Sequence, residues 1–412
     1  MPSTVIQRIA TRDARYPLQP GEGADAIHTT PTYAYAVALL QTDRPVHGTG
    51  LAFTLGGGNE LVCQAIIALG ETLVGREIEE LMAAFGTLFR QIADHHQYRW
   101  LGPHKGVVHL ALAALTNACF DLWAKSRGVP LWRLLLDLSP EQLVATLDLS
   151  YLDDVLTHAD ALKLLHAELP MREQRAGVLT RGYPGYDTSV GWFHYSDEEI
   201  YNHAQRALDA GFGAVKLKVG SPDLERDTRR ARLLRAAVGP DVRVMLDANQ
   251  QWTLPTALRA CKELSEIAPF WIEEPTHPDD VLAHQTLAQA ISPIRLAAGE
   301  HLPNRIMFKN YLQAQAAHFI QADCVRVGGV SEFLTISLLA RMFGKPVVPH
   351  VGDMGQIHQH LVLFNHIAIG HEDVFLEYIP HLRNQFRNPV QVEGGVYVTP
   401  QEIGSSADLV EA

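Results

Sequence analysis

Seven polar residues stand at the ends of short apolar runs in the second half of the chain, and successive members are 23 to 29 residues apart. That interval is about the length of one strand plus one returning helix. In a closed barrel of parallel strands, residues so placed meet at the mouth formed by the carboxyl ends of the strands, where the active sites of that fold lie. The seven are Lys218, Asp247, Glu273, Glu300, Asp323, His350 and Glu377.

Three of the seven, Asp247, Glu273 and Glu300, would bring carboxylates from three consecutive strands into one cavity. Such carboxylates repel one another unless a cation lies among them. Oxygen ligands without His or Cys favour a hard ion, and Mg²⁺ leaves coordination positions for water and substrate oxygens. Each acid could instead be a helix N-cap or a rim salt bridge, but the regular spacing of the trio favours a metal site. Zinc is disfavoured because no HExxH motif occurs and the 20 histidines show no other ligand spacing.

Two lysines, Lys216 and Lys218, occur in the run AVKLKV. Side chains at positions i and i+2 of a strand point to the same face, so both would enter the barrel. Two ammonium groups beside each other and near a dication disfavour each other's charge, so we expect a lowered pKa and a general base. A KxK pair alone is more typical of lysines that face solvent on a strand. A catalytic role is favoured here only because the predicted carboxylates face the two lysines.

Asp323 and His350 end two adjacent predicted strands and would form the opposite wall. A carboxylate that accepts a hydrogen bond from an imidazole fixes its tautomer and raises its basicity, which predicts an acid/base on the other side of the metal. A lone barrel histidine would instead be a structural donor. For Glu377 two alternatives stay open, an electrophile that shares a proton with a substrate carboxylate and a rim charge.

These residues need a scaffold that alternates strands and helices. From about residue 201 onward, short apolar strands alternate with helical stretches, which predicts a parallel sheet. Residues 1 to about 60 alternate apolar and polar positions around YAYAVALLQTD and GTGLAFTL, as antiparallel strands do, and residues 60–137 follow a helical pattern. Together they predict a small α+β unit. Residues 138–200 are rich in Pro, Gly and Tyr and are predicted to be irregular.

Composition excludes several classes of protein. The chain has 412 residues, 47% of them hydrophobic, which is enough for a large barrel with a smaller partner or for two to three ordinary domains. Its net charge of −12 and lack of Lys/Arg clusters argue against nucleic acid or an anionic membrane as a partner. The four cysteines are far apart, which predicts free thiols and a cytoplasmic location; they are Cys63, Cys119, Cys261 and Cys324.

No signal peptide or membrane span is predicted. The N-terminus lacks an apolar core, and no stretch of about 18 uninterrupted apolar residues occurs. The most apolar run, residues 106–120, has the spacing of a buried amphipathic helix. We therefore expect a soluble protein.

The strand-end motifs resemble the mandelate-racemase-like branch of the enolase superfamily, whose sites pair a Lys or His base with Mg²⁺. The similarity extends over nearly the whole chain, and several further segments look like L-fuconate dehydratases. The strand-end motifs are KLK, LDAN, WIEEP, AGEH, QADCVRVGGV and VPH, and the further segments include TRDARYP, GLAFTLGGGNE, RWLGPHKGVVHLA and YDTSVGWFHYSDE.

The resemblance implies an α/β fold, a modified (β/α)8, TIM-like barrel at residues 141–385. Residues 1–140 would form an α+β capping domain over its mouth, and residues 386–412 would return to that domain. It also implies that Asp247, Glu273 and Glu300 bind Mg²⁺, that Lys218 is a base, and that His350 with Asp323 is the acid dyad. A small sugar acid (an aldonate) is the expected partner, and we expect a homo-oligomer.

Two segments depart from the fuconate dehydratase pattern. In the loop at residues 24–34, Asn and Asp positions of that pattern are occupied by His28, Thr29, Thr30 and Thr32. After the catalytic histidine, Asp353 and Met354 stand where small residues are usual. Because that loop normally closes on the distal end of the substrate, we expect the core chemistry to be kept and the preferred sugar acid to differ.

The predicted reaction is a Mg²⁺-dependent dehydration in which Lys218 removes the C2 proton of an aldonate and protonated His350 assists departure of the C3 hydroxyl, giving a 2-keto-3-deoxy sugar acid. The C2 configuration of the substrate decides which of the two bases faces the proton. A racemase or epimerase is the main alternative, because a base on each face can return the proton. A cycloisomerase, and a silent scaffold protein on the same fold, are less well supported.

Overall fold

Three antiparallel strands begin the chain in the computed structural model, which describes residues 3–410. They are β1 (Ile6–Pro17), β2 (Thr32–Thr42) and β3 (His47–Thr54), in the order β1-β2-β3. The two strands expected from apolar alternation are β2 and β3. The sequence of β1, IQRIATRDARYP, carries many charged residues because much of the strand is exposed, so its pattern is weaker.

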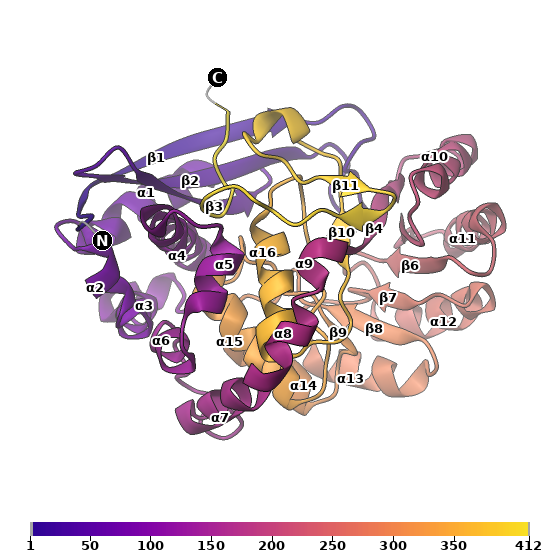
Figure 1. Ribbon diagram of the computed structural model, residues 1–412. Coiled ribbons are helices and arrows are strands. Elements are labelled where there is room, and N and C mark those ends of the chain that lie inside the picture. The colour runs from indigo at the N-terminus through magenta and orange to yellow at the C-terminus, as the bar shows by residue number, and fades with distance from the viewer. Residues whose placement is uncertain (1–2, 411–412) are drawn as a thin grey trace.

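The helices that follow the sheet in the chain are α1 (Asn59–Gly70), α2 (Ile78–Met82), α3 (Phe85–Ala93), α4 (Gly106–Arg127), α5 (Leu131–Asp137) and α6 (Pro140–Ala145). Of these, α1 and α4 lie against one face of the sheet (Figure 1). The longest, α4, lies directly against β3. A Cβ at Gly48 or Gly50 would overlap carbonyl oxygens of α4, so glycine permits this close approach. Among the described residues α4 is the one helix long and apolar enough to cross a membrane, but 89% of its apolar window is buried in the protein, as in a core helix.

The segment predicted to be irregular contains regular structure. It holds α7 (His158–Glu168), α8 (Arg172–Arg175), α9 (Val178–Arg181) and the first barrel strand, β4 (Tyr183–Gly191). The sequence of β4, YPGYDTSVG, contains Pro, Gly and Asp, which are rare in strands. Its pairing with strands on both sides, rather than local preference, makes it a strand.

The predicted strand and helix alternation is confirmed from β4 to the end of the barrel. The strands that follow are β5 (Ala214–Lys218), β6 (Arg243–Asp247), β7 (Trp271–Glu273), β8 (Arg295–Ala298), β9 (Phe319–Ile320) and β10 (Leu376–Tyr378). The helices are α10 (Asp197–Asp209), α11 (Leu224–Val238), α12 (Leu254–Leu264), α13 (Val281–Ala290), α14 (Arg305–Gln313), α15 (Gly329–Met342) and α16 (Ile357–Phe364).

Neighbouring strands from β4 to β9 are parallel, and β10 pairs in parallel with β4. The run PVVPH supplies an isolated parallel bridge between Val347 and Ile320, in place of a full strand between β9 and β10. The expected capping domain and modified barrel are thereby confirmed as the fold. Figure 1 shows the N-terminal sheet beside the barrel mouth, with the last helices of the barrel under it.

The C-terminal segment contacts both parts of the molecule. Its strands β11 (Val392–Glu393) and β12 (Val396–Tyr397) form a hairpin, and β12 pairs antiparallel with β4. Further on, the N–H of Ser405 donates a hydrogen bond to Asp121 of α4 over 2.7 Å. Asp408 forms an ion pair with Lys125 of the same helix at 2.7 Å. In Figure 1 this yellow segment crosses from the barrel to the N-terminal sheet.

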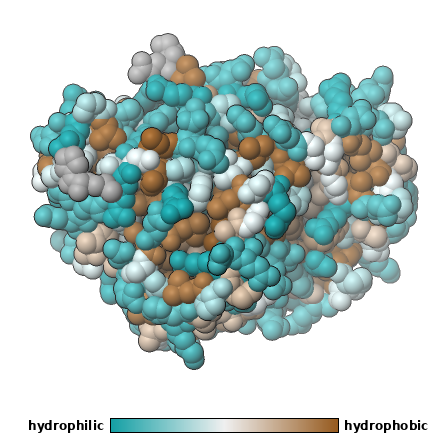
Figure 2. Space-filling model, viewed as in Figure 1, coloured by the Kyte–Doolittle hydropathy of each residue, from teal (hydrophilic) through white to brown (hydrophobic). Residues whose placement is uncertain are grey.

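The face of the molecule seen in Figure 2 is largely hydrophilic, and hydrophobic side chains gather near its centre, around α5. Buried hydrophobic residues form one large core that includes the N-terminal sheet, α4 and α15, and separate cores in the barrel. The shared core means that the capping unit and the barrel are packed together along α4 and α15.

Candidate active site

The three predicted metal-binding carboxylates lie together. Asp247 ends β6 and Glu273 ends β7, and the parallel register places these two residues side by side. Glu300 lies two residues beyond β8. All three are buried, and each offers an oxygen within 4.8 Å of the others.

These carboxylates suit a hard divalent cation. Oε2 of Glu300 is buried and has no hydrogen-bond partner among the described residues, although a buried anionic oxygen needs one. Glu274 and His301 form a second possible group with Glu300, also within 4.8 Å. That second group includes a histidine nitrogen, whereas the three carboxylates offer oxygen atoms alone. The set of Asp247, Glu273 and Glu300 is therefore the better candidate, and its oxygens are the ligands that Mg²⁺ prefers.

Both lysines of β5 enter the barrel, as predicted. Lys216 Nζ lies 2.7 Å from Oε1 of Glu273 and 2.7 Å from Oε1 of Glu377. Lys218 Nζ lies 2.5 Å from Oδ2 of Asp247 and 5.8 Å from the ring centroid of Trp192. The two ammonium groups thus sit among the carboxylates that would bind the metal.

The direction of the lysine pKa shifts differs from the prediction. Burial lowers the pKa of Lys216, but the attraction of Glu273 and Glu377 outweighs burial and leaves that pKa well above its usual value. Burial also acts to lower the pKa of Lys218, but the attraction of Asp247 outweighs burial and leaves that pKa above its usual value. The prediction considered the repulsion between the lysines and a dication, whereas the carboxylates dominate here.

The predicted dyad is present on the opposite side. His350 Nδ1 lies 2.8 Å from Oδ2 of Asp323, and His350 Nε2 lies 3.4 Å from Oε1 of Glu300. Burial lowers the pKa of His350, but the negative charges of Glu300 and Glu377 and the hydrogen bond to Asp323 raise it overall. Burial raises the pKa of Asp323, and its two histidine neighbours more than reverse this, so Asp323 is ionised.

The side chain of Glu377, in β10, is 0% exposed, so Glu377 is not a charge on the rim of the barrel. Its Oε1 accepts a hydrogen bond from Thr188 Oγ1 over 2.5 Å, and its Oε2 accepts one from the N–H of Val351 over 3.0 Å. Burial raises the pKa of Glu377, but Lys216 and His350 hold it below its usual value. Glu377 is therefore ionised here and anchors Lys216.

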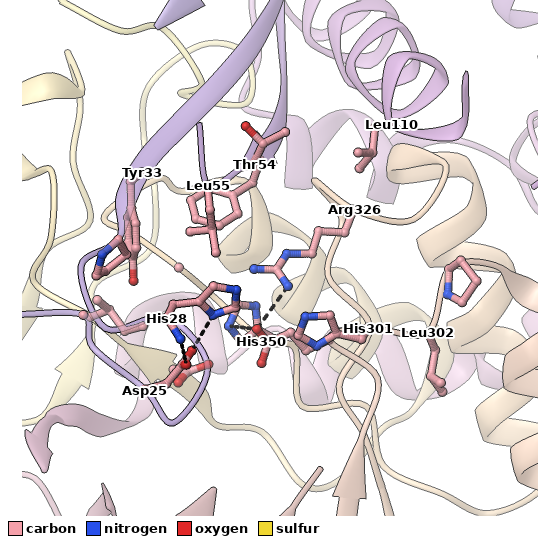
Figure 3. A pocket seen from close by; sticks show the side chains of 18 of the residues that line it. Asp25, His28, Tyr33, Thr54, Leu55, Leu110, His301, Leu302, Arg326 and His350 are labelled. Carbon is pink, nitrogen blue, oxygen red and sulfur yellow. Dashed lines mark hydrogen bonds and ion pairs between the residues drawn. The ribbon is translucent and has the colours of Figure 1, made fainter. Parts of the chain in front are cut away.

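A cavity of about 420 Å³ joins these residues to the capping unit. Lys218, Glu300, His350 and Glu377 line it from the barrel, while Lys216, Asp247, Glu273 and Asp323 lie behind this lining. The 24–34 loop contributes Asp25, His28 and Pro31 to the opposite wall, and Tyr33 follows in β2. Figure 3 shows Asp25 and His28 directed toward the barrel residues.

The loop's shape is held by Asp25. Its Oδ1 accepts hydrogen bonds from the N–H groups of Ile27 and His28, and its Oδ2 lies 2.9 Å from His28 Nδ1. Burial raises the pKa of Asp25, but His28 and Lys218 lower it overall. The first departure from the fuconate dehydratase pattern thus lies in the cavity wall.

The second departure, at Asp353 and Met354, lies outside the cavity lining. Met354 is fully buried. Asp353 accepts a hydrogen bond from the hydroxyl of Tyr35 in β2 and another from the N–H of Gly355. It therefore ties the segment after His350 to the capping sheet.

Two residues of the site, Arg326 and Thr188, were not singled out from the sequence. Arg326 donates to Oε1 of Glu300 over 3.0 Å and stacks on Phe53 of β3. Thr188 is hidden in the atypical strand β4. The sequence signal for Arg326 was its position three residues after Asp323. No comparable spacing marked Thr188.

Comparison with known proteins gives matches in both parts of the chain. Residues 7–135 match the mandelate racemase / muconate lactonizing enzyme N-terminal domain, and residues 199–412 match the enolase C-terminal domain-like family. Mitochondrial enolase superfamily member 1 of Homo sapiens is 41% identical over 98% of this chain and 94% of that protein. L-galactonate dehydratase of Hypocrea jecorina is 37% identical over 99% of this chain and 93% of that protein.

Solved structures share the fold. The crystal structure of the human protein just named has a TM-score of 0.96 at 40% identity, covering 99% of this chain and 95% of that chain. An L-talarate dehydratase from Polaromonas, complexed with Mg and L-glucarate, has a TM-score of 0.76 at 24% identity, covering 99% of this chain and 95% of that chain. At that lower identity the second structure supports the fold alone.

Proposed function

This chain belongs to the mandelate racemase and muconate lactonizing enzyme family of the enolase superfamily, and we propose that it is a hydro-lyase that dehydrates an acid sugar. The observation that carries the proposal is that Lys218 and His350 line one cavity together with Glu300. Removal of water from a 2,3-dihydroxy acid needs a base for the C2 proton and an acid for the C3 hydroxyl. Its similarity to an L-galactonate dehydratase supports the same chemistry.

Asp247, Glu273 and Glu300 would hold Mg²⁺, with Oε2 of Glu300 as a free ligand. The ion would supply positive charge that counters the attraction of these carboxylates for Lys218 and stabilises the negative charge that develops on the substrate carboxylate.

The residues of the chain then carry out two steps. Lys218 Nζ takes the C2 proton, and the electrons of that bond pass into the substrate's enediolate. As the C3–O bond breaks, Nε2 of His350 gives its proton to the departing hydroxyl, which leaves as water. The resulting enol becomes the 2-keto-3-deoxy acid. For a substrate of opposite C2 configuration, His350 would face the proton instead.

The remaining predicted site residues support these two. Asp323 accepts from Nδ1–H of His350 and so keeps its Nε2 on the cavity side. Lys216 holds Glu273 and Glu377 in place through its two ion pairs. Glu377 lines the cavity and, like Glu273, lies 2.7 Å from Lys216 Nζ, so it connects that buried lysine to the cavity wall.

For the substrate we propose a six-carbon aldonate of the L-galacto configuration. L-fuconate is 6-deoxy-L-galactonate, so the fuconate dehydratase motifs and the L-galactonate dehydratase relative agree in configuration and differ only at C6. His28 lines the cavity on the loop where the chain departs from the fuconate pattern, and an imidazole can hydrogen-bond a hydroxyl. This favours L-galactonate over L-fuconate.

A substrate screen tests the proposal. Purified protein with Mg²⁺ would be incubated with a panel of hexonic and pentonic acids, and keto acids would be detected with semicarbazide. We expect the highest kcat/KM for L-galactonate, a lower value for L-fuconate, and no product in EDTA. If C2 epimers accumulate without any keto acid, the enzyme is an epimerase and the dehydratase proposal is wrong.

Two wider proposals concern location and assembly. The four cysteines are buried free thiols, which supports a reducing compartment such as the cytoplasm. We also propose that the protein is a homo-oligomer, which size-exclusion chromatography with light scattering would test.

A further inference from the structure

One buried carboxylate at the barrel mouth contacts two imidazoles. Oδ2 of Asp323 lies 2.8 Å from Nδ1 of His350, and Oδ1 lies 3.0 Å from Nε2 of His358. Asp323 is 1% exposed and His358 is 4% exposed, so solvent does not compete for either contact. The two histidines thus bind opposite oxygens of the same carboxylate.

His358 has no access to the substrate. It lies in the first turn of α16, is buried, and is absent from the lining of the cavity that His350 and Lys218 share. Any part it plays in the reaction must pass through Asp323.

The proton on His358 Nε2 can be placed by charge. This nitrogen faces Oδ1 of Asp323, but it also lies 2.9 Å from the N–H of Cys324, to which it would be an acceptor. If Nε2 were bare, its lone pair would face an ionised carboxylate oxygen at 3.0 Å, which is repulsive in a buried site. A charge-assisted hydrogen bond from Nε2–H to Asp323 is stronger than one between neutral groups. On this balance we place the proton on Nε2, so that it donates to Asp323 and the N–H of Cys324 loses this acceptor.

Oδ1 of Asp323 is held from two sides, because the N–H of Val325 also donates to it over 2.9 Å. With Oδ1 fixed, the plane of the carboxylate is fixed, and Oδ2 is directed at His350. We propose that His358 is a positioning residue, which aligns Asp323 so that Nε2 of His350 points into the cavity for proton delivery. This inference rests on the proposed dehydratase function.

Three substitutions at one position separate positioning from bulk. His358→Gln keeps an N–H donor at about the reach of Nε2, His358→Asn carries the same amide one carbon shorter, and His358→Leu removes the donor. We expect kcat for dehydration to fall roughly 10- to 100-fold in the Leu and Asn variants, since a misplaced catalytic group costs up to about 100-fold. KM should stay within about twofold, because His358 does not touch substrate. The Gln variant should recover most of kcat.

A second readout separates positioning from general damage. In D2O, exchange of the C2 proton depends on Lys218, whereas loss of the C3 hydroxyl depends on His350. The Leu and Asn variants should therefore keep C2 exchange while elimination falls. His360→Gln is the matched control: His360 lies in the same helix, is fully buried, and accepts from the N–H of Trp132 over 3.2 Å. It should leave kcat unchanged.

The outcomes are distinct. If wild-type protein dehydrates no acid sugar, the proposed function fails. If wild type is active and the kcat of His358→Leu or His358→Asn equals that of wild type, His358 does not position His350. The same conclusion follows if the kcat of His358→Gln is as low as that of His358→Leu. A parallel fall of exchange and elimination would also overturn the inference. Should the Leu variant not fold, the Gln and Asn variants decide alone.

Discussion

Lys216 is the cation that balances the buried carboxylates of the site, and its replacement by methionine gives the most informative single test. The ammonium is 1% exposed and forms ion pairs of 2.7 Å with both Glu273 and Glu377. Asp247 lies 3.5 Å away. Methionine keeps an unbranched side chain but removes the ammonium that pairs with Glu273 and Glu377, while Asp247 keeps its ion pair with Lys218.

The cost follows from burial. Removing one partner of a buried ion pair destabilises a protein by about 3–5 kcal/mol, because the remaining charge is uncompensated. We therefore expect Lys216→Met to lower the free energy of unfolding by about 3–5 kcal/mol in EDTA. Excess Mg²⁺ stabilises any variant that binds it, by about 2.7 kcal/mol at one hundred times its Kd. The gain should be larger in Lys216→Met, because the ammonium that repels the dication is gone.

Urea unfolding followed by circular dichroism, in EDTA and in excess Mg²⁺, measures both effects. Lys125→Met is the matched control, since Lys125 also forms ion pairs of 2.7 Å with two carboxylates, Asp121 and Asp408, far from the site. It should be destabilised equally with and without Mg²⁺. If Lys216→Met is as stable as wild type in EDTA, or if Mg²⁺ stabilises both lysine variants alike, Lys216 does not balance the metal carboxylates.

Four further outcomes are expected. Glu273→Gln, which removes a ligand charge at constant volume, should prevent Mg²⁺ from restoring activity after EDTA; full turnover in metal-free buffer would contradict this. Replacing residues 24–34 by the fuconate dehydratase loop should change the preferred acid sugar but not the Mg²⁺ affinity measured by calorimetry. Lys218→Ala should stop C2 exchange in D2O, whereas His350→Asn should block elimination and leave slow exchange; normal dehydration by His350→Asn would make that histidine structural. Burial raises the pKa of Asp187 to about 6, because the ionised carboxylate is less stable in the folded protein than in water. The free energy of unfolding therefore falls as the pH rises from about 4 through 6. Asp187→Asn should thus raise the free energy of unfolding at pH 8 by about 3 kcal/mol, with no gain near pH 4.

The position of the three candidate metal-binding carboxylates was predictable because barrel geometry is periodic. Asp247 and Glu273 end adjacent strands at an interval that one helix fills, so spacing alone brought them to one edge. The same argument placed Asp323 beside His350. These are contacts between equivalent positions of a repeated unit, and a repeated unit leaves a regular trace in the sequence.

Contacts that break the repeat left no such trace. Strand β4 is held by pairing on both sides and has little strand preference of its own, so Thr188 was missed. His358 reaches Asp323 from a helix, at a position that no strand spacing marks. The lysine pKa shifts depend on distances between Nζ and carboxylate oxygens, which a one-dimensional pattern does not contain.

The pairing of β4 also bears on the order in which the molecule can be completed during synthesis. This first barrel strand takes one neighbour, β5, from the next segment of the chain, but its other partners, β10 and β12, come from residues 376–378 and 396–397. Until those residues leave the ribosome, the backbone groups of β4 on that side lack their partners and present an open sheet edge. The N-terminal sheet and α4 can fold early, but the barrel can close only after nearly the whole protein has been made.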